Sequence, residues 1–305
     1  MLRTVILLIF TIVVVPMLAY KFGTPLNVTQ EETLWVLIYT CLGIALAGFV
    51  VAEISKNYSQ TDKLWSLTPL IYSWIAVVYS DWNIRMIYLA VLVSIWGLRL
   101  SYNFSRRGGY SWKFWEGEED YRWAILQQKP PFNKPWVYSL FNLFFISLYQ
   151  HFLILLFTLP ILLSMDQKTI GIWDYVLGAI ILGLVYMEWL ADQQQYDYQT
   201  EKYRRINSGE KLDGIYAKGF VHTGLWAKMR HPNYAAEQSI WIVFYLFSVV
   251  ATGLPIINWS IIGCILLVIL FKSSSDFSEE ISASKYPEYS EYQKKVGRFI
   301  PKLSS

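Results

Sequence analysis

The stretch "RHPNYAAE", which starts at Arg230, places groups that can bind an anion or move a proton beside an apolar run. Pro232 suits the first turn of a helix, because its missing N–H would have no partner there anyway. We therefore predict a helix that begins at His231 or Pro232. A helix N-terminus attracts anions, and Arg230 and His231 add positive charge to it. Asn233 and Glu237 share one face of this helix, and Glu237 lies about one turn inside the apolar segment.

A helix cap with interfacial anchors is the alternative for this stretch. The buried position of Glu237 favours a functional role, because a carboxylate at that depth is costly without a partner. A second stretch, "EWLADQQ", places Glu188 and Asp192 four residues apart at the end of another apolar run. Its alternative is a helix that leaves the membrane and becomes amphipathic.

Two further stretches carry charge at the ends of apolar runs. In "WGLRLSYNFSRRGG", Arg99 and Arg107 lie close to a glycine pair, and such arginines can clamp a phosphate. Arginines that only snorkel to the membrane surface are the alternative. In "TDKLWSLTP", Asp62 opens an apolar run, where it could also simply cap a helix.

The composition shows what kind of element must position these groups. Hydrophobic residues make up 54% of the 305 residues, the mean hydropathy is +0.32, and only 16% are charged. Soluble domains have about a quarter of their residues charged, so this is the composition of a membrane protein. The net charge of +3, without a Lys/Arg run, argues against a nucleic-acid partner. The three histidines and two cysteines lack metal-ligand spacing, so no metal site is expected.

The apolar runs predict an all-α, multi-pass bundle of about eight transmembrane helices, with seven possible, since a span needs about 20 residues. The first run is interpreted as a retained helix rather than a signal peptide. The predicted spans are 4–20, 33–52, 65–80, 84–104, 137–163, 172–191, 236–253 and 256–272.

Loop charge predicts the orientation of these spans. Placing both termini in the cytoplasm puts nearly all Lys and Arg on that side, as the positive-inside rule expects. The opposite side keeps only Lys21, Arg85 and Lys168. The long loops and the C-terminal tail are then expected to form a cytoplasmic cap. All four charged stretches fall at this side, which predicts a pocket for a phosphate-bearing cofactor and for a lipophilic substrate from the bilayer.

Several of these motifs together resemble a known family. "GLWAKMRHPNYAAE", "EWLADQQ" and "YPEYSEYQKKVGRFIP" are similar to the steroid 5-alpha-reductase-like family of multi-pass membrane proteins. "TDKLWSLTP" and "WGLRLSY…EEDYRW" resemble its uncharacterised, mainly microbial branch. The resemblance divides the chain into two N-terminal helices, 1–54, and a reductase-like membrane domain, 55–305, with core motifs in 188–301.

The resemblance implies an oxidoreductase that acts on a CH–CH group, using NADPH to reduce a conjugated C=C bond of a lipophilic substrate. The candidate cofactor-binding residues are Arg99, Arg107, Asp192, Arg230, His231, Asn233, Tyr234 and Tyr289; the two arginines at 99 and 107 come from the charge pattern, and the others lie in the motifs that carry the resemblance. The candidate catalytic residues are Asp62, near the family's acidic residue on an early span, Tyr102 as a second possible donor, and Glu237. Hydride delivery to an enone leaves charge on its carbonyl oxygen, which needs a proton donor. A buried Asp62 that stays protonated could serve.

Two departures and two alternatives accompany this interpretation. The steroid enzymes have a His-rich stretch where this chain has "FKSSSDFSEE", and an arginine of theirs is replaced here by Lys218. Prenylcysteine and phospholipid methyltransferases share a similar Arg-His-Pro-x-Tyr element, so a methyltransferase using S-adenosylmethionine is one alternative. A non-catalytic lipid-binding membrane protein is the other. For the location, the branch that the chain resembles favours a bacterial inner membrane over the endoplasmic reticulum.

Overall fold

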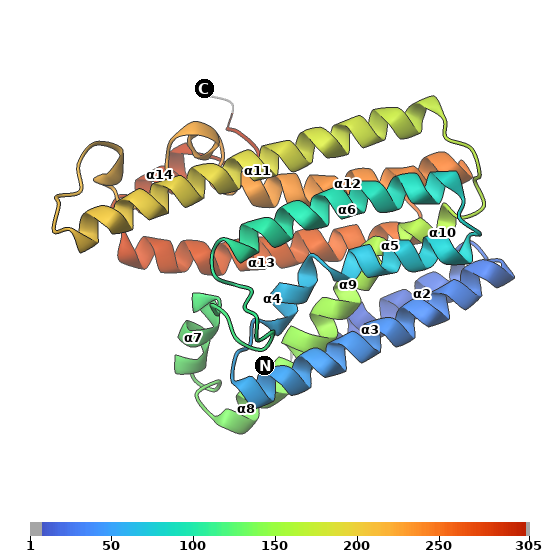
Figure 1. Cartoon of the computed structure of the whole chain (residues 1–305), viewed down its shortest axis with the longest axis horizontal. Helices are drawn as coiled ribbons and strands as arrows, with labels where there is room; N and C mark the ends of the chain where they lie inside the picture. The colour runs from blue at the N-terminus through green and yellow to red at the C-terminus, as the bar shows by residue number, and fades with distance from the viewer. Residues whose placement is uncertain (1–7, 303–305) are drawn as a thin grey trace. The chain divides into compact units, whose positions relative to one another are not determined.

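The computed structural model describes residues 8–302 and is drawn in Figure 1. The chain is all-helical, with 73% helix and, in the part that the structure describes, no strand. The all-α prediction is therefore confirmed. The chain forms two compact units. Unit 1 comprises Met1–Ala179 and Trp241–Leu267, and unit 2 comprises Ile180–Ile240 and Val268–Ser305. The predicted boundary after residue 54 concerns family coverage rather than packing, and it stays a prediction.

Six helical segments are long and apolar enough to cross a membrane, so the chain is a multi-pass membrane protein. Each corresponds to one of the predicted spans. They are α3 (Val28–Ser55), α6 (Ile84–Ser105), the run Pro135–Leu163, α11 (Ile172–Asn207), α12 (Pro232–Thr252) and the run Trp259–Lys285. The run Pro135–Leu163 comprises α8 (Pro135–Phe141), the π-helix η2 (Asn142–Tyr149), α9 (Gln150–Thr158) and α10 (Pro160–Leu163). The run Trp259–Lys285 comprises η5 (Trp259–Ile261) and α13 (Ile262–Lys285).

The other two predicted spans are shorter helices, so the count of eight is not confirmed. The span 65–80 corresponds to α5 (Thr68–Tyr79), whose 12 residues follow the short α4 (Gln60–Trp65). At about 1.5 Å per residue, α5 is well short of a hydrocarbon core of about 30 Å. It ends where Asp81 and Trp82 adopt φ of 55° and 56°, which no helix continues. The span 4–20 lies partly outside the described residues; η1 (Phe10–Val14) and α2 (Val15–Phe22) follow there.

The core of unit 1 is aromatic where three of its helices meet. Trp96 of α6 packs edge-on against Trp241 of α12, with ring centroids 4.9 Å apart, and Phe157 of α9 lies 4.3 Å from Trp241. Trp96 and Trp241 are each 1% exposed. Rings of this size bury much apolar surface and prefer such tilted contacts, so they hold these helices in register.

Unit 2 contains the polar end of α11, the start of α12, most of α13, and the short elements between and after them. These are η3 (Gly214–Tyr216), η4 (Gly224–Ala227) and α14 (Tyr289–Lys295). Phe220, Tyr289 and Tyr292 form an aromatic cluster that packs the C-terminal tail against the loop before α12. The loop and tail therefore pack against each other, and the predicted cytoplasmic cap stays a prediction.

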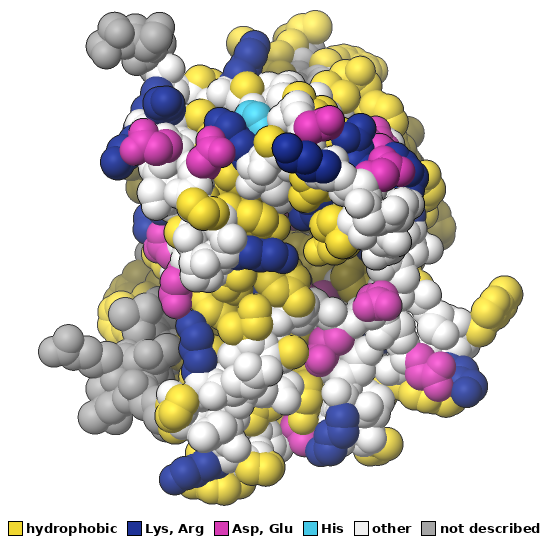
Figure 2. All heavy atoms as spheres, turned by 90° about the vertical axis from the view of Figure 1, so that its left-hand side faces the viewer, with side chains coloured by type: hydrophobic (Ala, Val, Ile, Leu, Met, Phe, Trp, Pro, Cys, Tyr) yellow, Lys and Arg dark blue, Asp and Glu magenta, His cyan; other side chains and the backbone are white. Residues whose placement is uncertain are grey.

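The face drawn in Figure 2 carries basic and acidic side chains interspersed with hydrophobic ones. Surfaces that bind nucleic acids usually present a basic patch or stripe instead. The exclusion of a nucleic-acid partner stays a prediction from the sequence.

Candidate functional site

The helix α12 begins at Pro232, which confirms the predicted start. The residues just before it are held by the C-terminal tail. The backbone N–H of Arg230 donates to Gly297 O at 2.8 Å, and that of His231 donates to Arg298 O at 3.0 Å. Met229 and Gly297 form a parallel β-bridge beside them. The entry to α12 is therefore fixed to the tail by main-chain bonds.

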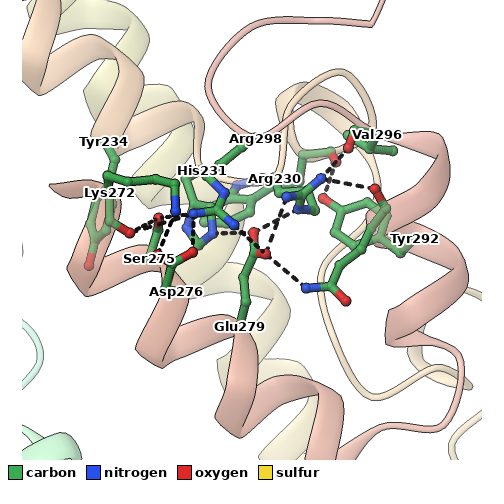
Figure 3. Close-up of polar contacts among 12 residues, drawn as sticks. Arg230, His231, Tyr234, Lys272, Ser275, Asp276, Glu279, Tyr292, Val296 and Arg298 are labelled. Carbon is green, nitrogen blue, oxygen red and sulfur yellow. Dashed lines mark hydrogen bonds and ion pairs between the residues drawn. The ribbon is translucent and has the colours of Figure 1, made fainter. Parts of the chain in front are cut away.

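The side chains of Arg230 and His231 both turn toward Glu279 of α13, as Figure 3 shows. Glu279 Oε1 accepts hydrogen bonds from Arg230 Nε at 2.7 Å and His231 Nε2 at 2.9 Å. Glu279 Oε2 accepts from Gln293 Nε2 at 2.8 Å and lies 3.4 Å from Arg298 Nη2. Glu279 is only 3% exposed, so it is a buried carboxylate surrounded by donors. We call Glu279, Arg230, His231, Gln293 and Arg298 the Glu279 network.

Arg230 has further partners within the protein. Its Nη1 donates to Gln293 O at 3.1 Å and to Val296 O. A guanidinium carries five donors, and here they bind a carboxylate and two carbonyls. The sequence predicted that Arg230 and His231 bind an external anion, and that role stays a prediction. The structure supplies an internal anion, Glu279, at the same position.

The residues that the resemblance matched on α11 and α12 lie together. Asn233 Nδ2 donates to Asp192 Oδ1 at 3.1 Å. Asp192 is 8% exposed, and one turn away along each helix lie Glu188 and Glu237, which are 4% and 3% exposed. Three carboxyls and an amide thus occupy the facing sides of two helices within unit 2. Buried carboxyls in this number are uncommon, because each is costly to remove from water.

Tyr234 and Tyr289 lie in aromatic surroundings. The Tyr234 ring stacks on His231 at 5.4 Å and meets Phe271 edge-on at 4.7 Å. The Tyr289 ring lies 5.0 Å from Phe220. Burial raises the pKa of Tyr289 to about 12, so its hydroxyl stays protonated. Tyr289 therefore belongs to the packed tail, and its predicted contact with a cofactor stays a prediction.

In unit 1 the structure joins two stretches that the sequence singled out separately. Asp62 Oδ2 accepts a hydrogen bond from Trp123 Nε1 at 3.0 Å. Trp123 belongs to α7 (Tyr121–Gln128), which Asp120 caps. Burial, reinforced by the neighbouring Asp120, raises the pKa of the Asp62 carboxyl. The protonated form is thereby favoured, as the predicted role of a proton donor needs.

Backbone contacts hold the loop before α7 against the segment around Asp62. Lys63 Nζ donates to Phe114 O at 3.2 Å and to Glu116 O at 2.5 Å. Asn57 Nδ2 donates to Gly117 O at 2.9 Å. Gly117 has φ of 118°, and a Cβ there would lie 2.5 Å from Gly109 O, so this turn requires glycine. The loop is therefore a fitted part of unit 1.

The remaining predicted residues of unit 1 are less enclosed. Tyr102 is 59% exposed and lies under the Arg106 guanidinium at 5.6 Å. Arg107 is exposed, whereas Arg99 is half-buried near the end of α6. The exposure of Tyr102 does not favour it as a catalytic donor, and Asp62 is the better placed of the two.

Sequence reasoning missed the Glu279 network and Trp123. Glu279 lies in "FKSSSDFSEE", which was noted only for its departure from the steroid enzymes. The available signal was its spacing of three residues from Asp276, which places both carboxylates on one face of a helix. In the structure Arg298 of the tail contacts both. Among the described residues, no group of three or more His, Cys, Asp or Glu could hold a metal ion.

The helices define a class, the multi-pass helical membrane proteins. The chain belongs to the family described as "Protein of unknown function (DUF1295)", whose model matches residues 48–296. It is 37% identical over 288 residues to the fission yeast (Schizosaccharomyces pombe) "Uncharacterized protein C594.04c", covering 90% of this chain and 81% of that relative. No solved structure matches. None of these comparisons names the steroid 5-alpha-reductase-like family, so that relationship contributes only to the proposal below.

Proposed function

We propose that this protein is a membrane-embedded, NADPH-dependent reductase of a conjugated C=C bond in a lipophilic substrate. The observation that carries the proposal is the contact of 3.1 Å between Asn233 and Asp192, with Glu237 buried one turn deeper. These are the positions that the resemblance matches to cofactor binding and catalysis. Asn233 and Asp192 are 41 residues apart in the sequence and come from two helices, so their contact supports a common site.

The donors and acceptors of this pair suit a nucleotide cofactor. An amide and a carboxylate held together can bind ribose hydroxyls or a carboxamide, which offer both donors and acceptors. Bound NADPH would supply a hydride. The carboxylates of Asp192 and Glu237 would orient the polar groups of the cofactor, and the surrounding apolar helices would exclude water.

We propose that a pocket in unit 2, whose lining holds two lysines and the carboxylate of Glu291, contacts part of such a cofactor. It has a volume of about 130 Å³ and is lined by Lys218, Phe220, His222, Ala227, Glu291, Tyr292, Lys295 and Val296. Sites for whole ligands usually measure about 300–1,000 Å³, so this pocket has room for only part of a nucleotide. Lys218 lies 3.2 Å from Glu288, and Lys295 adds a second ammonium.

Reduction of an enone also needs a proton donor for the carbonyl oxygen. We propose Asp62 for this role, because its pKa is raised by burial and Trp123 holds its carboxyl group. A neutral carboxyl can donate a hydrogen bond to the oxygen as charge develops there. We also propose that both termini lie on the cytoplasmic side. A relative occurs in fission yeast, a eukaryote, so the expected bacterial inner membrane stays a prediction.

One observation favours a second candidate, a methyltransferase using S-adenosylmethionine. The guanidinium of Arg230 binds Glu279 and backbone carbonyls, so the Arg-His-Pro element supplies less phosphate-binding charge than expected. S-adenosylmethionine carries no phosphate and would not need that charge.

Cofactor binding to the detergent-purified full chain tests both candidates. A ligand that binds only the folded state raises the melting temperature, so NADPH, NADH and S-adenosylmethionine are titrated in parallel. We expect NADPH to stabilise the protein and Asn233→Ala to abolish the effect. Asn207→Ala, at the exposed end of α11, is the matched control. Stabilisation by S-adenosylmethionine alone would overturn the reductase in favour of the methyltransferase. No shift with any ligand would favour a non-catalytic lipid-binding protein.

A further inference from the structure

We infer that Glu279 is a positioning residue for the proposed cofactor site. It holds Arg230 and His231, and through them it sets the first turn of α12, from which Asn233 reaches Asp192. The inference rests on the proposed function for what the site binds. The hydrogen bonds that position Asn233 lie within the protein and can be tested without a ligand.

The Glu279 carboxylate is held at both oxygens. Its Oε1 accepts from Arg230 Nε and His231 Nε2 at 2.7 and 2.9 Å, and its Oε2 accepts from Arg230 Nη2 at 3.2 Å. Gln293 Nε2 donates to Oε2 at 2.8 Å. Charge-assisted and bidentate bonds of this kind fix direction as well as distance. The position of Glu279 on α13 therefore determines where Arg230 and His231 lie, as Figure 3 shows.

The two residues held by Glu279 lead directly into α12. The N–H of Ala235 donates to His231 O at 3.0 Å, which is the first bond of the helical ladder. Asn233 lies within this first turn. Because a helix continues rigidly from its first bonds, the direction of the Asn233 side chain follows the orientation of His231. The bond of 3.1 Å to Asp192 thus depends on how residue 231 is held.

The main-chain bonds to the tail do not fix this orientation by themselves. Arg230 and His231 each form one backbone bond to the same short segment, Gly297 and Arg298. Two bonds along one edge leave the segment able to twist about that edge. The Glu279 side chain adds polar attachments from a different element, α13, beside the ring contact of Tyr234 with Phe271 of the same helix, and these attachments restrict the twist. Binding sites lose much of their affinity when a supporting contact shifts them by about 1 Å.

A cross-linking experiment tests the geometry without any nucleotide. Cysteines replace Asp192 and Asn233 in a chain whose Cys41 and Cys264 are changed to Ala, and a short bifunctional thiol reagent joins them. We expect Glu279→Gln to slow cross-linking several-fold, with the product measured by mass spectrometry. Glu280→Gln makes the same chemical change at the next, exposed residue and should leave the rate unchanged. An unchanged rate in folded Glu279→Gln would overturn the inference. If that variant does not fold, Glu279→Asp takes its place, because the shorter carboxylate keeps the charge but cannot hold both partners.

A second readout separates positioning from general stability. Below the melting temperature, we expect Glu279→Gln to raise the Kd for NADPH on the order of tenfold, because Asn233 is then held less firmly toward Asp192; partners that orient metal ligands have effects of similar size. In an Asn233→Ala background the same substitution should change the Kd little, because the contact through which it acts is gone. An equal, additive effect in that background would contradict the inference. If the unaltered chain binds no NADPH, the proposed function fails, and the cross-linking rate still decides the role of Glu279.

Discussion

Each unit contains a buried arginine–carboxylate pair, and the two pairs differ in how many further hydrogen-bond partners surround them. In unit 1, Arg85 of α6 contacts a single oxygen of Asp174, with Nε at 2.9 Å and Nη2 at 2.7 Å. Nη2 also donates to Phe247 O at 2.8 Å. Asp174 Oδ2 accepts from Gly171 N at 2.8 Å. Among the described residues, Arg85 Nη1 has no hydrogen-bond partner, and Arg85 is 0% exposed.

The pair in unit 2 is surrounded by further donors. Glu279 has three side-chain partners besides Arg230, and Arg298 also contacts Asp276. Loss of one bond there leaves others in place, whereas Asp174 is the carboxylate with which Arg85 forms its ion pair. The comparison teaches that burial of an ion pair does not by itself indicate its role. The isolated pair joins three membrane helices, and the branched network holds the loop before α12 to α13 and the tail, beside the proposed site.

Removal of the carboxylate in unit 1 should have the largest effect. Asp174→Asn leaves the Arg85 charge buried without a counter-ion, and we expect a loss of about 3–5 kcal/mol in the free energy of unfolding. Thermal or denaturant unfolding in detergent measures it, with Asp197→Asn on the exposed part of α11 as the control. The double variant Arg85→Met/Asp174→Leu should recover much of the loss, because no charge then remains buried. A loss no larger than that of the control would show that Arg85 finds another partner.

A milder change in unit 2 sharpens the comparison. Arg230→Lys keeps one charge near Glu279 but cannot also reach the carbonyls of Gln293 and Val296. His231, Gln293 and Arg298 still satisfy Glu279, so we expect a loss of about 1–2 kcal/mol. The same unfolding assay, run beside Asp174→Asn, measures the difference. A loss as large as that of Asp174→Asn would remove the distinction between the two networks.

The half-buried carboxyl of Asp62 is paired with an indole rather than an arginine, and its effect should be the smallest. Its pKa is raised on folding, so the folded state keeps the proton to a higher pH than the unfolded chain. Stability is therefore unaffected by this group below the unfolded pKa of about 4, and it falls as pH rises toward the folded pKa.

The melting temperature as a function of pH tests this sign. Asp62→Asn keeps an oxygen for Trp123 and removes the titration, so the melting temperature of the variant should fall less than that of the unaltered chain above pH 4. Parallel curves for the two proteins would show that Asp62 has an ordinary pKa.

The hydrophobic runs predicted the six long helices because length and composition alone decide whether a helix can cross a bilayer. The same runs overestimated the length of the helix at 65–80, because the positive φ angles of Asp81 and Trp82 end α5 after 12 residues. Pro232 marked the start of α12 because proline acts through its own ring and its own missing N–H. Such signals are local, and they can be recognised without knowledge of the fold.

The partners of charged residues could not be predicted in the same way. Arg230 and Glu279 are 49 residues apart, and Arg85 and Asp174 are 89 residues apart. The sequence assigned Arg85 to a side of the membrane by charge counting, but its side chain is fully buried against Asp174. Asp192 and Asn233 were each singled out in the sequence, but their contact was not predicted, since a spacing of 41 residues carries no periodic signal.

The C-terminal tail also bears on how the protein is made. Gln293, Gly297 and Arg298 follow every helix that is long enough to cross the membrane. During synthesis these helices can enter the bilayer one after another, while Glu279 waits for its donors Gln293 and Arg298, which are made after them. Membrane insertion and completion of the site are thus separate events in time. A chain cut after residue 288 should still insert its helices, but it would present a buried carboxylate without Gln293 and Arg298 to quality-control proteases. Loss of the tail would then appear in cells as low abundance rather than as an inactive, stable protein.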